Sequence, residues 1–347
     1  MSKIDVKSLD FQELEKHIQE WNIPKFRAKQ IYQWLHQKLV RDFAEMTNLP
    51  KEFREQLAES FDLVSLLPVD IKISKIDGTR KYLFALDDGN IIESVLMKYK
   101  HGNSVCISSQ VGCRMGCKFC ASTLDGLERN LKPSEMLDQI YYIQKAIKER
   151  VSHVVVMGSG EPLDNYDNLL KFITLLSNQD GLSISQRNIT ISTCGLVPEI
   201  IRLSKESLQI TLALSLHAPN DEIRKGLMPI AARYKLPEII DACEEYFKQT
   251  GRRITYEYSL IKGVNDTKAE AKALAQLLKG KAAHVNLIPV NPIKERDFVQ
   301  SDYKFIVDFK NVLEKYRINA TIRREMGRDI QGACGQLRKS FIDKKDN

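Results

Sequence analysis

The sequence Cys113-Arg-Met-Gly-Cys117-Lys-Phe-Cys120 places three cysteines close together, with three and then two residues between them. No fourth cysteine continues the run. A site with four cysteine ligands saturates a metal ion or an iron–sulfur cluster and leaves no open position for chemistry. Three thiolates on a cubane cluster instead leave one iron without a protein ligand. The spacing therefore points to a reactive cluster whose open iron binds a substrate or a cofactor.

Two other interpretations of the three cysteines stay open at this point. They fit a zinc knuckle completed by Cys106 or His101, or they are ordinary thiols of a reduced cytosolic protein. The chain has seven cysteines, and an odd number with three crowded together does not indicate a disulfide framework. Cys194 and Cys243 belong to no motif, and we expect them to be buried thiols.

The spacing C-x3-C-x2-C resembles the signature of the radical S-adenosylmethionine (SAM) superfamily. In that superfamily the cluster is [4Fe–4S], its open iron holds the amino and carboxylate groups of SAM, and one electron cleaves SAM to a 5′-deoxyadenosyl radical. Phe119 agrees with the resemblance, because an aromatic residue usually precedes the third cysteine. The resemblance implies that Cys113, Cys117 and Cys120 are the cluster ligands.

Length and composition suit one large domain with an appendage, since 43% of the 347 residues are hydrophobic. No apolar run approaches the length of a membrane span, and the start Met1-Ser-Lys-Ile-Asp5 lacks the apolar core of a signal peptide. We therefore expect a cytoplasmic protein with no membrane partner. The net charge is +7, and residues 315–347 are rich in Lys and Arg. This segment is either a solvated tail or an electrostatic footprint for nucleic-acid phosphates.

The chain before the cysteines changes its period once. Residues 1–65 place apolar side chains at helical spacing and predict a small helical domain. From Leu67 the period is two, and Asp77-Gly78 marks a hairpin between two strands. Residues 66–102 are therefore expected to form a β-ribbon that leads into the cysteine loop.

Residues 103–326 alternate between buried strands and amphipathic helices. Six such repeats predict a parallel α/β sheet with right-handed crossovers, wound as an incomplete (β/α)6 barrel. Residues 327–347 follow as a C-terminal segment. The expected strands are 104–108, 153–157, 188–193, 211–216, 254–261 and 285–290, with a final strand at 320–324, and the expected helices are 133–151, 165–178, 198–204, 236–249, 267–278 and 302–316.

Polar residues gather where the expected barrel strands end, which is where active sites of such barrels form. The cysteine loop follows the first strand, and Gly160-Glu161-Pro162 follows the second. Glu161 can accept a hydrogen bond from the ammonium of SAM, and a glycine lets the backbone approach an amino acid closely. A zinc knuckle does not require polar residues at the strand ends. Their presence there therefore favours an iron–sulfur cluster over zinc. Further candidate SAM-binding residues at later strand ends are Ser192, Ser215, Leu216, His217 and Asn291.

Several segments together resemble one family, RlmN/Cfr, whose members are radical SAM enzymes that methylate an adenine of 23S ribosomal RNA. Within it, Gly160-Glu161-Pro162-Leu163 resembles the RlmN branch, which acts on adenine carbon 2 and also on an adenine beside the anticodon of some tRNAs. The alternatives are Cfr-like methylation of carbon 8, which confers antibiotic resistance, and a radical SAM enzyme with a non-RNA substrate. The matching segments are Glu93-Ser-Val-Leu-Met-Lys-Tyr99, Val105-Cys106-Ile-Ser-Ser-Gln-Val-Gly-Cys113, Met157-Gly-Ser-Gly-Glu-Pro-Leu163, Ser215-Leu-His217 and Gly332-Ala-Cys334-Gly-Gln-Leu337.

The resemblance implies roles for three residues outside the cluster. Cys334 accepts a methyl group from one SAM, and a second SAM provides the radical that takes a hydrogen from this S-methyl group. The methylene carbon adds to the adenine, Glu93 removes the ring proton, and Cys106 forms a disulfide with Cys334 and releases the product. The resemblance also implies 23S rRNA and tRNA as partners and an electron donor such as flavodoxin or ferredoxin. We expect a monomer.

Overall fold

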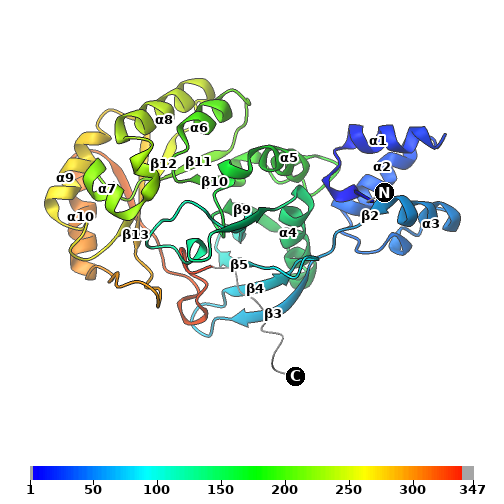
Figure 1. Ribbon diagram of the computed structural model, residues 1–347, viewed down its shortest axis with the longest axis horizontal. Helices are drawn as coiled ribbons and strands as arrows, with labels where there is room; N and C mark the ends of the chain where they lie inside the picture. Colours follow the sequence, from blue (N-terminus) through cyan, green and yellow to red (C-terminus); the bar gives the residue numbers. More distant parts are fainter. Residues whose placement is uncertain (1–2, 338–347) are drawn as a thin grey trace.

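The computed structural model of the protein, which describes residues 3–337, is built around one curved ten-stranded sheet (Figure 1). The strands lie in the order β14-β13-β12-β11-β10-β9-β6-β5-β4-β3. Their bounds are β3 (Leu67–Ile73), β4 (Arg80–Ala85), β5 (Ile91–Tyr99), β6 (Gly102–Ile107), β9 (Val151–Val156), β10 (Ile189–Thr193), β11 (Thr211–Ser215), β12 (Ile254–Leu260), β13 (Ala283–Pro289) and β14 (Asn319–Ile322).

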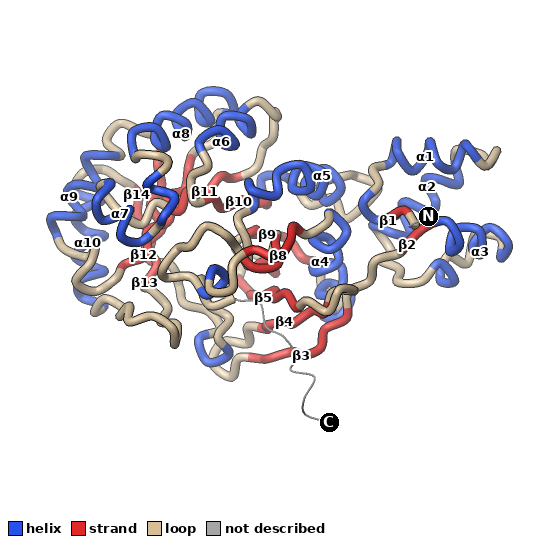
Figure 2. Tube along the Cα trace, viewed as in Figure 1, coloured by secondary structure: helices blue, strands red, loops and turns tan. Residues whose placement is uncertain are grey.

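The seven strands from β6 to β14 are parallel, and helices connect them along the outside of the curved sheet (Figure 2). The order of strands does not return to its start, so the sheet stays open. This confirms the α/β fold and the incomplete (β/α)6 barrel expected from the alternation. The connecting helices are α4 (Pro133–Ile147), α5 (Tyr166–Ser177), α6 (Val197–Ser204), α7 (Asp221–Leu227), α8 (Leu236–Thr250), α9 (Lys268–Leu277) and α10 (Tyr303–Lys315).

The expected β-ribbon continues the same sheet. Strands β3, β4 and β5 are antiparallel, and β5 pairs with β6 so that Val95 lies opposite Cys106. β3 forms the outer edge, and every second side chain along it is apolar. Between 41% and 57% of the surface of these four side chains is exposed: Leu67, Val69, Ile71 and Ile73.

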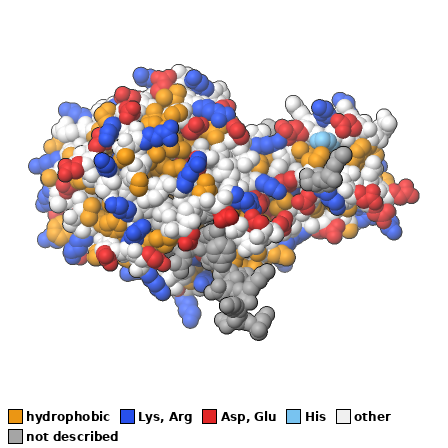
Figure 3. Space-filling model, in the orientation of Figure 1, with side chains coloured by type: hydrophobic (Ala, Val, Ile, Leu, Met, Phe, Trp, Pro, Cys, Tyr) orange, Lys and Arg blue, Asp and Glu red, His pale blue; other side chains and the backbone are white. Residues whose placement is uncertain are grey.

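The N-terminal helices form a lobe that a waist separates from the barrel (Figures 1 and 3). The lobe contains α1 (Phe11–Glu20), α2 (Phe26–His36) and α3 (Lys51–Ser60), with the short parallel pair β1 (Ile4–Asp5) and β2 (Phe61–Asp62). None of the helices within residues 3–337 is long and apolar enough to cross a bilayer.

Two buried contacts hold the lobe against α4 of the barrel. The Lys7 Nζ atom lies 2.5 Å from the Asp138 carboxylate, and the His36 Nδ1 atom lies 2.8 Å from the Tyr141 hydroxyl. Removing one partner of a buried ion pair leaves an uncompensated charge, so Lys7 and Asp138 depend on each other. The N-terminal lobe and the barrel are therefore packed against each other at the waist.

The structure differs from the expected elements at three places. The helix expected over 133–151 ends at Ile147, because Lys148 adopts a left-handed conformation with φ of 54° and Val151 already begins β9. The helix α7 and the pair β7 (Gln110–Gly112) and β8 (Leu127–Asn130) were not expected. These elements are too short to show a period. Of the C-terminal segment 327–347, residues 338–347 lie outside the described part.

Candidate active site

The cysteine loop is closed at its base by the antiparallel pair of β7 and β8. The Cys113 amide donates to the Gly126 carbonyl at 2.9 Å. A Cβ atom at Gly112 would lie 1.9 Å from the Gly126 oxygen, so only glycine allows this closure. The Thr123 hydroxyl donates to the carbonyls of Cys117 and Cys120 at 3.1 and 2.9 Å. The loop is therefore held by the β7–β8 pair and by hydrogen bonds between its own residues.

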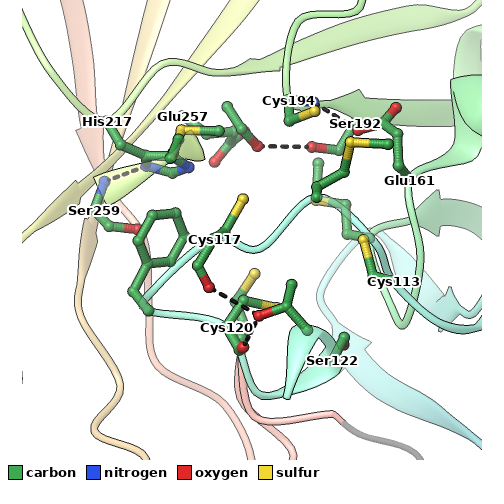
Figure 4. A pocket seen from close by; sticks show the side chains of 18 of the residues that line it. Cys113, Cys117, Cys120, Ser122, Glu161, Ser192, Cys194, His217, Glu257 and Ser259 are labelled. Atoms are coloured by element: carbon green, nitrogen blue, oxygen red, sulfur yellow. Dashed lines mark hydrogen bonds between the residues drawn. The ribbon is translucent and has the colours of Figure 1, made fainter. Parts of the chain in front are cut away.

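The three thiols line one cavity (Figure 4), whose empty volume, its mouth included, is about 900 Å³. Burial raises the pKa of Cys113 to about 12 and raises the pKa of Cys117 and Cys120 as well. Metal binding must therefore displace protons from these thiols. Soft thiolates are the usual ligands of iron–sulfur clusters, so the donor set fits a cluster held by three cysteines.

The alternative fourth zinc ligands lie elsewhere. Cys106 lines a separate cavity, and His101 stacks on Tyr99 and meets His153 edge-on, with ring centroids 5.0 and 4.8 Å apart. A zinc knuckle completed by Cys106 or His101 is therefore wrong for this arrangement.

Gly160 and Glu161 form the wall beside the cysteine loop. Gly160 has φ of 109°, and a Cβ atom there would lie 2.6 Å from the Gln110 Cβ. The Glu161 carboxylate accepts the Cys194 amide at 2.7 Å and the Leu163 amide at 3.1 Å. Burial raises the pKa of Glu161 despite these bonds. The carboxylate thus fixes the end of β10 as well as lining the cavity.

The ends of the following strands supply hydroxyl, imidazole and amide groups to the same cavity (Figure 4). The Ser192 and Ser215 hydroxyl oxygens lie 3.3 Å apart. His217 accepts the Ser259 amide at Nδ1 over 2.9 Å, and burial lowers its pKa to about 3, so its imidazole is neutral at physiological pH. Its ring also packs edge-on against Phe119. These groups can bind hydroxyl and carboxylate groups of a ligand without adding charge.

Leu216 does not share this position. Its side chain is fully buried and does not line the cavity, and its amide donates to the Glu257 carbonyl at 3.0 Å. β11 ends at Ser215, and His217 adopts a left-handed conformation with φ of 56°. A contact between Leu216 and SAM would have to come from the Leu216 backbone, and its role in SAM binding stays a prediction.

Several polar or thiol side chains of the cavity were not predicted, among them Glu257, Arg323 and Cys194. Glu257 accepts the Asn286 amide at 2.9 Å, and burial raises its pKa although the Arg323 guanidinium opposes the shift. Arg323, which the sequence groups with the basic tail, instead lines this cavity. Cys194 lines it too, beside Cys117. Arg323 directly follows β14, and a polar residue at a strand end was the available signal for it, whereas Glu257 lies within β12 and had no such signal.

A second cavity adjoins the first and contains the other two candidate cysteines, Cys106 and Cys334. Cys334, Asn291 and Arg323 line both cavities. The Asn291 side-chain amide donates to the Cys334 carbonyl at 2.9 Å, so it holds the C-terminal segment. Both thiols are free, and burial raises the pKa of Cys106 to about 12.

Glu93 lies on β5 outside the lining of both cavities. It is 3% exposed, and its carboxylate lies 2.8 Å from the Lys81 ammonium. Since Val95 pairs with Cys106, and residues two apart on a strand share a face, Glu93 points to the same side of the sheet as Cys106.

Comparison with known proteins agrees with this geometry. Residues 107–275 match the model of the Radical SAM superfamily, and residues 4–63 match the Ribosomal RNA large subunit methyltransferase N-terminal domain. A solved structure, a radical SAM methyltransferase from Sphaerobacter thermophilus, superposes with a TM-score of 0.93 at 43% identity, over 96% of this chain and 99% of that one.

Curated relatives match nearly the whole chain. A protein of Lachnoclostridium phytofermentans named "Probable dual-specificity RNA methyltransferase RlmN" is 63% identical over 99% of this chain and 96% of its own. A protein of the same name from Lachnospira eligens is 62% identical over 99% of this chain and 98% of its own. With its open barrel, its three-cysteine cavity and these relatives, the chain belongs to the RlmN family of the radical SAM superfamily.

Proposed function

We propose that this protein methylates carbon 2 of a specific adenine in 23S rRNA and of an adenine beside the anticodon in some tRNAs, using two SAM per turnover. The names of its relatives support an RNA substrate, and the superfamily match supports radical chemistry. The observation that carries the proposal is the position of Cys334, which lines both the cavity of the three loop cysteines and the cavity of Cys106.

The first cavity suits the two groups that this chemistry needs. Cys113, Cys117 and Cys120 are the ligands for a [4Fe–4S] cluster, and the strand ends opposite them, with Ser192 and Ser215, are the surface for SAM. Once bound, these groups supply a 5′-deoxyadenosyl radical.

Cys334 is the residue that carries the methyl group. Its thiolate attacks the methyl of one SAM, and a hydrogen atom is then abstracted from the S-methyl group. The methylene carbon adds to carbon 2 of adenine, which is electrophilic and offers no nucleophile to an ordinary methyltransferase. Loss of one electron, which an oxidised one-electron carrier takes up, and of the ring proton, which Glu93 accepts, leaves a thioether between Cys334 and the RNA.

Cys106 completes the turnover. Its thiolate attacks the Cys334 sulfur, the carbon–sulfur bond breaks, and the departing carbon takes a proton to become the methyl group. The resulting disulfide must be reopened by an external thiol reductant. A separate one-electron donor, such as flavodoxin or ferredoxin, starts each round of radical formation.

The test is mass spectrometry of nucleosides from 23S rRNA and tRNA of cells with and without the gene for this protein. We expect 2-methyladenosine to disappear from both RNAs in its absence and to return when the gene is restored. A gene encoding the Cys334→Ala protein should fail to restore it. Loss of 8-methyladenosine instead would assign the carbon-8 activity, and unchanged RNA in both classes would exclude an RNA substrate.

A further inference from the structure

The segment that carries Cys334 has little structure of its own. Between Gly327 and Leu337 it contains only the three-residue 3-10 helix Arg328–Ile330, and Gln331 adopts a left-handed conformation with φ of 52°. A chain in this state has many accessible conformations, so external contacts must select one. Two groups of hydrogen bonds, one on each side of the segment, do this.

The first group comes from the cysteine loop. The Ala121 amide donates to the Gly335 carbonyl at 2.8 Å, and the Ser122 hydroxyl donates to the Leu337 carbonyl at 2.6 Å. With the Asn291 amide on the Cys334 carbonyl, these bonds hold the backbone at Cys334 and directly after it. They fix the end of the segment that reaches the cavity.

The second group comes from the turn between β3 and β4, about 250 residues earlier in the chain. The Asp329 carboxylate accepts the Ser74 hydroxyl at 2.7 Å and the Lys75 amide at 2.9 Å. In return, the Asp77 carboxylate accepts the Gly327 amide at 3.0 Å. Asp329 of the C-terminal segment and Asp77 of the turn therefore each accept hydrogen bonds from the other segment.

Lys81 extends this junction into the sheet. It follows the turn on β4, and only 4% of its surface is exposed. Its ammonium donates to the Gln331 carbonyl at 3.1 Å and lies 2.8 Å from the Glu93 carboxylate. One hairpin therefore touches both the segment that bears Cys334 and the carboxylate assigned as the base.

We propose that the β3–β4 hairpin is a positioning platform for Cys334, and that Asp329 is the residue that seats the segment on it. This inference rests on the proposed function, because it concerns where the methyl-bearing sulfur stands. Cys334 has to meet SAM in one cavity and Cys106 in the other. A misplacement of about 1 Å can cost roughly a hundredfold in rate, so a loosened segment should slow methyl transfer without weakening SAM binding.

The experiment compares Asp329→Ala with Asp70→Ala, in reconstituted full-length protein whose Cys334 starts unmethylated. Asp70 is an exposed carboxylate on β3 that pairs with Lys72 on the same strand. The measured quantities are the rate at which Cys334 gains a methyl group from SAM without RNA, read by peptide mass spectrometry, and the Kd for SAM. Asp329→Asn, which keeps one acceptor oxygen, serves as the conservative variant.

We expect Asp329→Ala to lower the methylation rate about tenfold or more with an unchanged Kd for SAM. Asp70→Ala should match the unaltered protein, and Asp329→Asn should recover part of the rate. An Asp329→Ala rate equal to that of the unaltered protein would overturn the platform and leave the proposed function intact. Equal loss of SAM binding would also overturn it, since that indicates general damage. If the unaltered protein never gains a methyl group on Cys334, the proposed function itself fails.

Discussion

Each of the two thiols that meet in the second cavity has a different environment. Cys106 is 8% exposed, and burial raises its pKa to about 12, although the Arg323 guanidinium beside it opposes the shift. Cys334 is half-buried on a segment that is held by hydrogen bonds and by the packing of Leu337. Cys106, a buried thiol on a rigid strand, suits the role of the thiol that attacks once per turnover. Cys334, on the C-terminal segment, suits the role of the thiol that has to reach both SAM and Cys106.

Removal of Cys106 should trap the covalent intermediate. Cys106→Ala leaves the cluster ligands, Cys334 and Glu93 in place, so the reaction should proceed as far as the thioether and stop there. Denaturing gel electrophoresis before and after nuclease treatment would show an RNA-dependent band for Cys106→Ala and none for Cys334→Ala. Normal turnover by Cys106→Ala would rule out the two-cysteine mechanism.

The release step should accelerate with pH. The folded-state pKa of Cys106 lies near 12, so below that value its thiolate fraction rises about tenfold for each pH unit. Decay of the RNA adduct in a single turnover of the unaltered protein, which keeps Cys106, should therefore have a slope near one on a logarithmic plot between pH 7 and about 9. Replacing Arg323 by Met removes the opposing cation and should slow decay at every pH. A rate that levels off near neutral pH would contradict the raised pKa.

At the residue scale, the sequence identified the site residues that belong to a recognisable motif and missed those that belong to none. The three loop cysteines and Ser192, Ser215 and His217 line the first cavity as expected. Glu257 sits within a buried strand, where one acidic residue in an apolar run has no spacing to mark it. Arg323 looks like part of a basic tail in the sequence, and only the pairing of β14 with β13 turns it inward. Glu93 as base remains a prediction.

At the scale of elements, the long periodic segments were predictable and the places where they stop were not. The strands and the longer helices of residues 103–326 follow their expected positions closely. The end of α4 departs from its expected position, because Lys148 adopts a left-handed conformation that glycine usually occupies. The hairpin at Asp77-Gly78 was expected, but its contact with the C-terminal segment depends on tertiary packing that no local pattern encodes.

Lys148→Gly should stabilise the protein. Lys148 is exposed with φ of 54°, and a left-handed residue other than glycine costs roughly 1 kcal/mol. Gly251, which ends α8 with φ of 67° and open space around it, provides the reciprocal change, and Gly251→Ala should destabilise by about the same amount. Denaturant unfolding of the two variants measures both changes. Shifts in the same direction would show that conformation at the helix end is not the cause.

At the scale of the whole molecule, the junction between the helical lobe and the barrel contains a histidine that stays neutral. Burial, with a smaller contribution from the Lys7 charge, lowers the pKa of His36 to about 3. The unfolded chain takes up a proton near pH 6.5, so between these values the unfolded state binds more protons. Stability is therefore complete above about pH 6.5 and falls as the pH drops toward 3.

The expected slope is about 1.4 kcal/mol for each pH unit within that window. His36→Gln should remove the part of the pH dependence of the unfolding free energy that His36 causes. A similar slope, which His217 causes, should remain. His17→Gln, on the outer side of the lobe, serves as the matched control. Calorimetry of the cluster-free protein from about pH 4 to 7 measures this. An unaltered slope in His36→Gln would mean that the junction opens before the histidine is protonated.

The outer strand of the sheet has a consequence for the protein in concentrated solution. β3 ends the ten-stranded sheet, and its apolar side chains Leu67, Val69, Ile71 and Ile73 stand beside an unpaired row of backbone amides and carbonyls within the described chain. Such an edge is a template for another extended chain. Crowded copies would therefore tend to join edge to edge into ribbons and be lost from solution as the protein is concentrated. Replacing Ile71 by lysine would interrupt the apolar row and keep the protein in solution at high concentration.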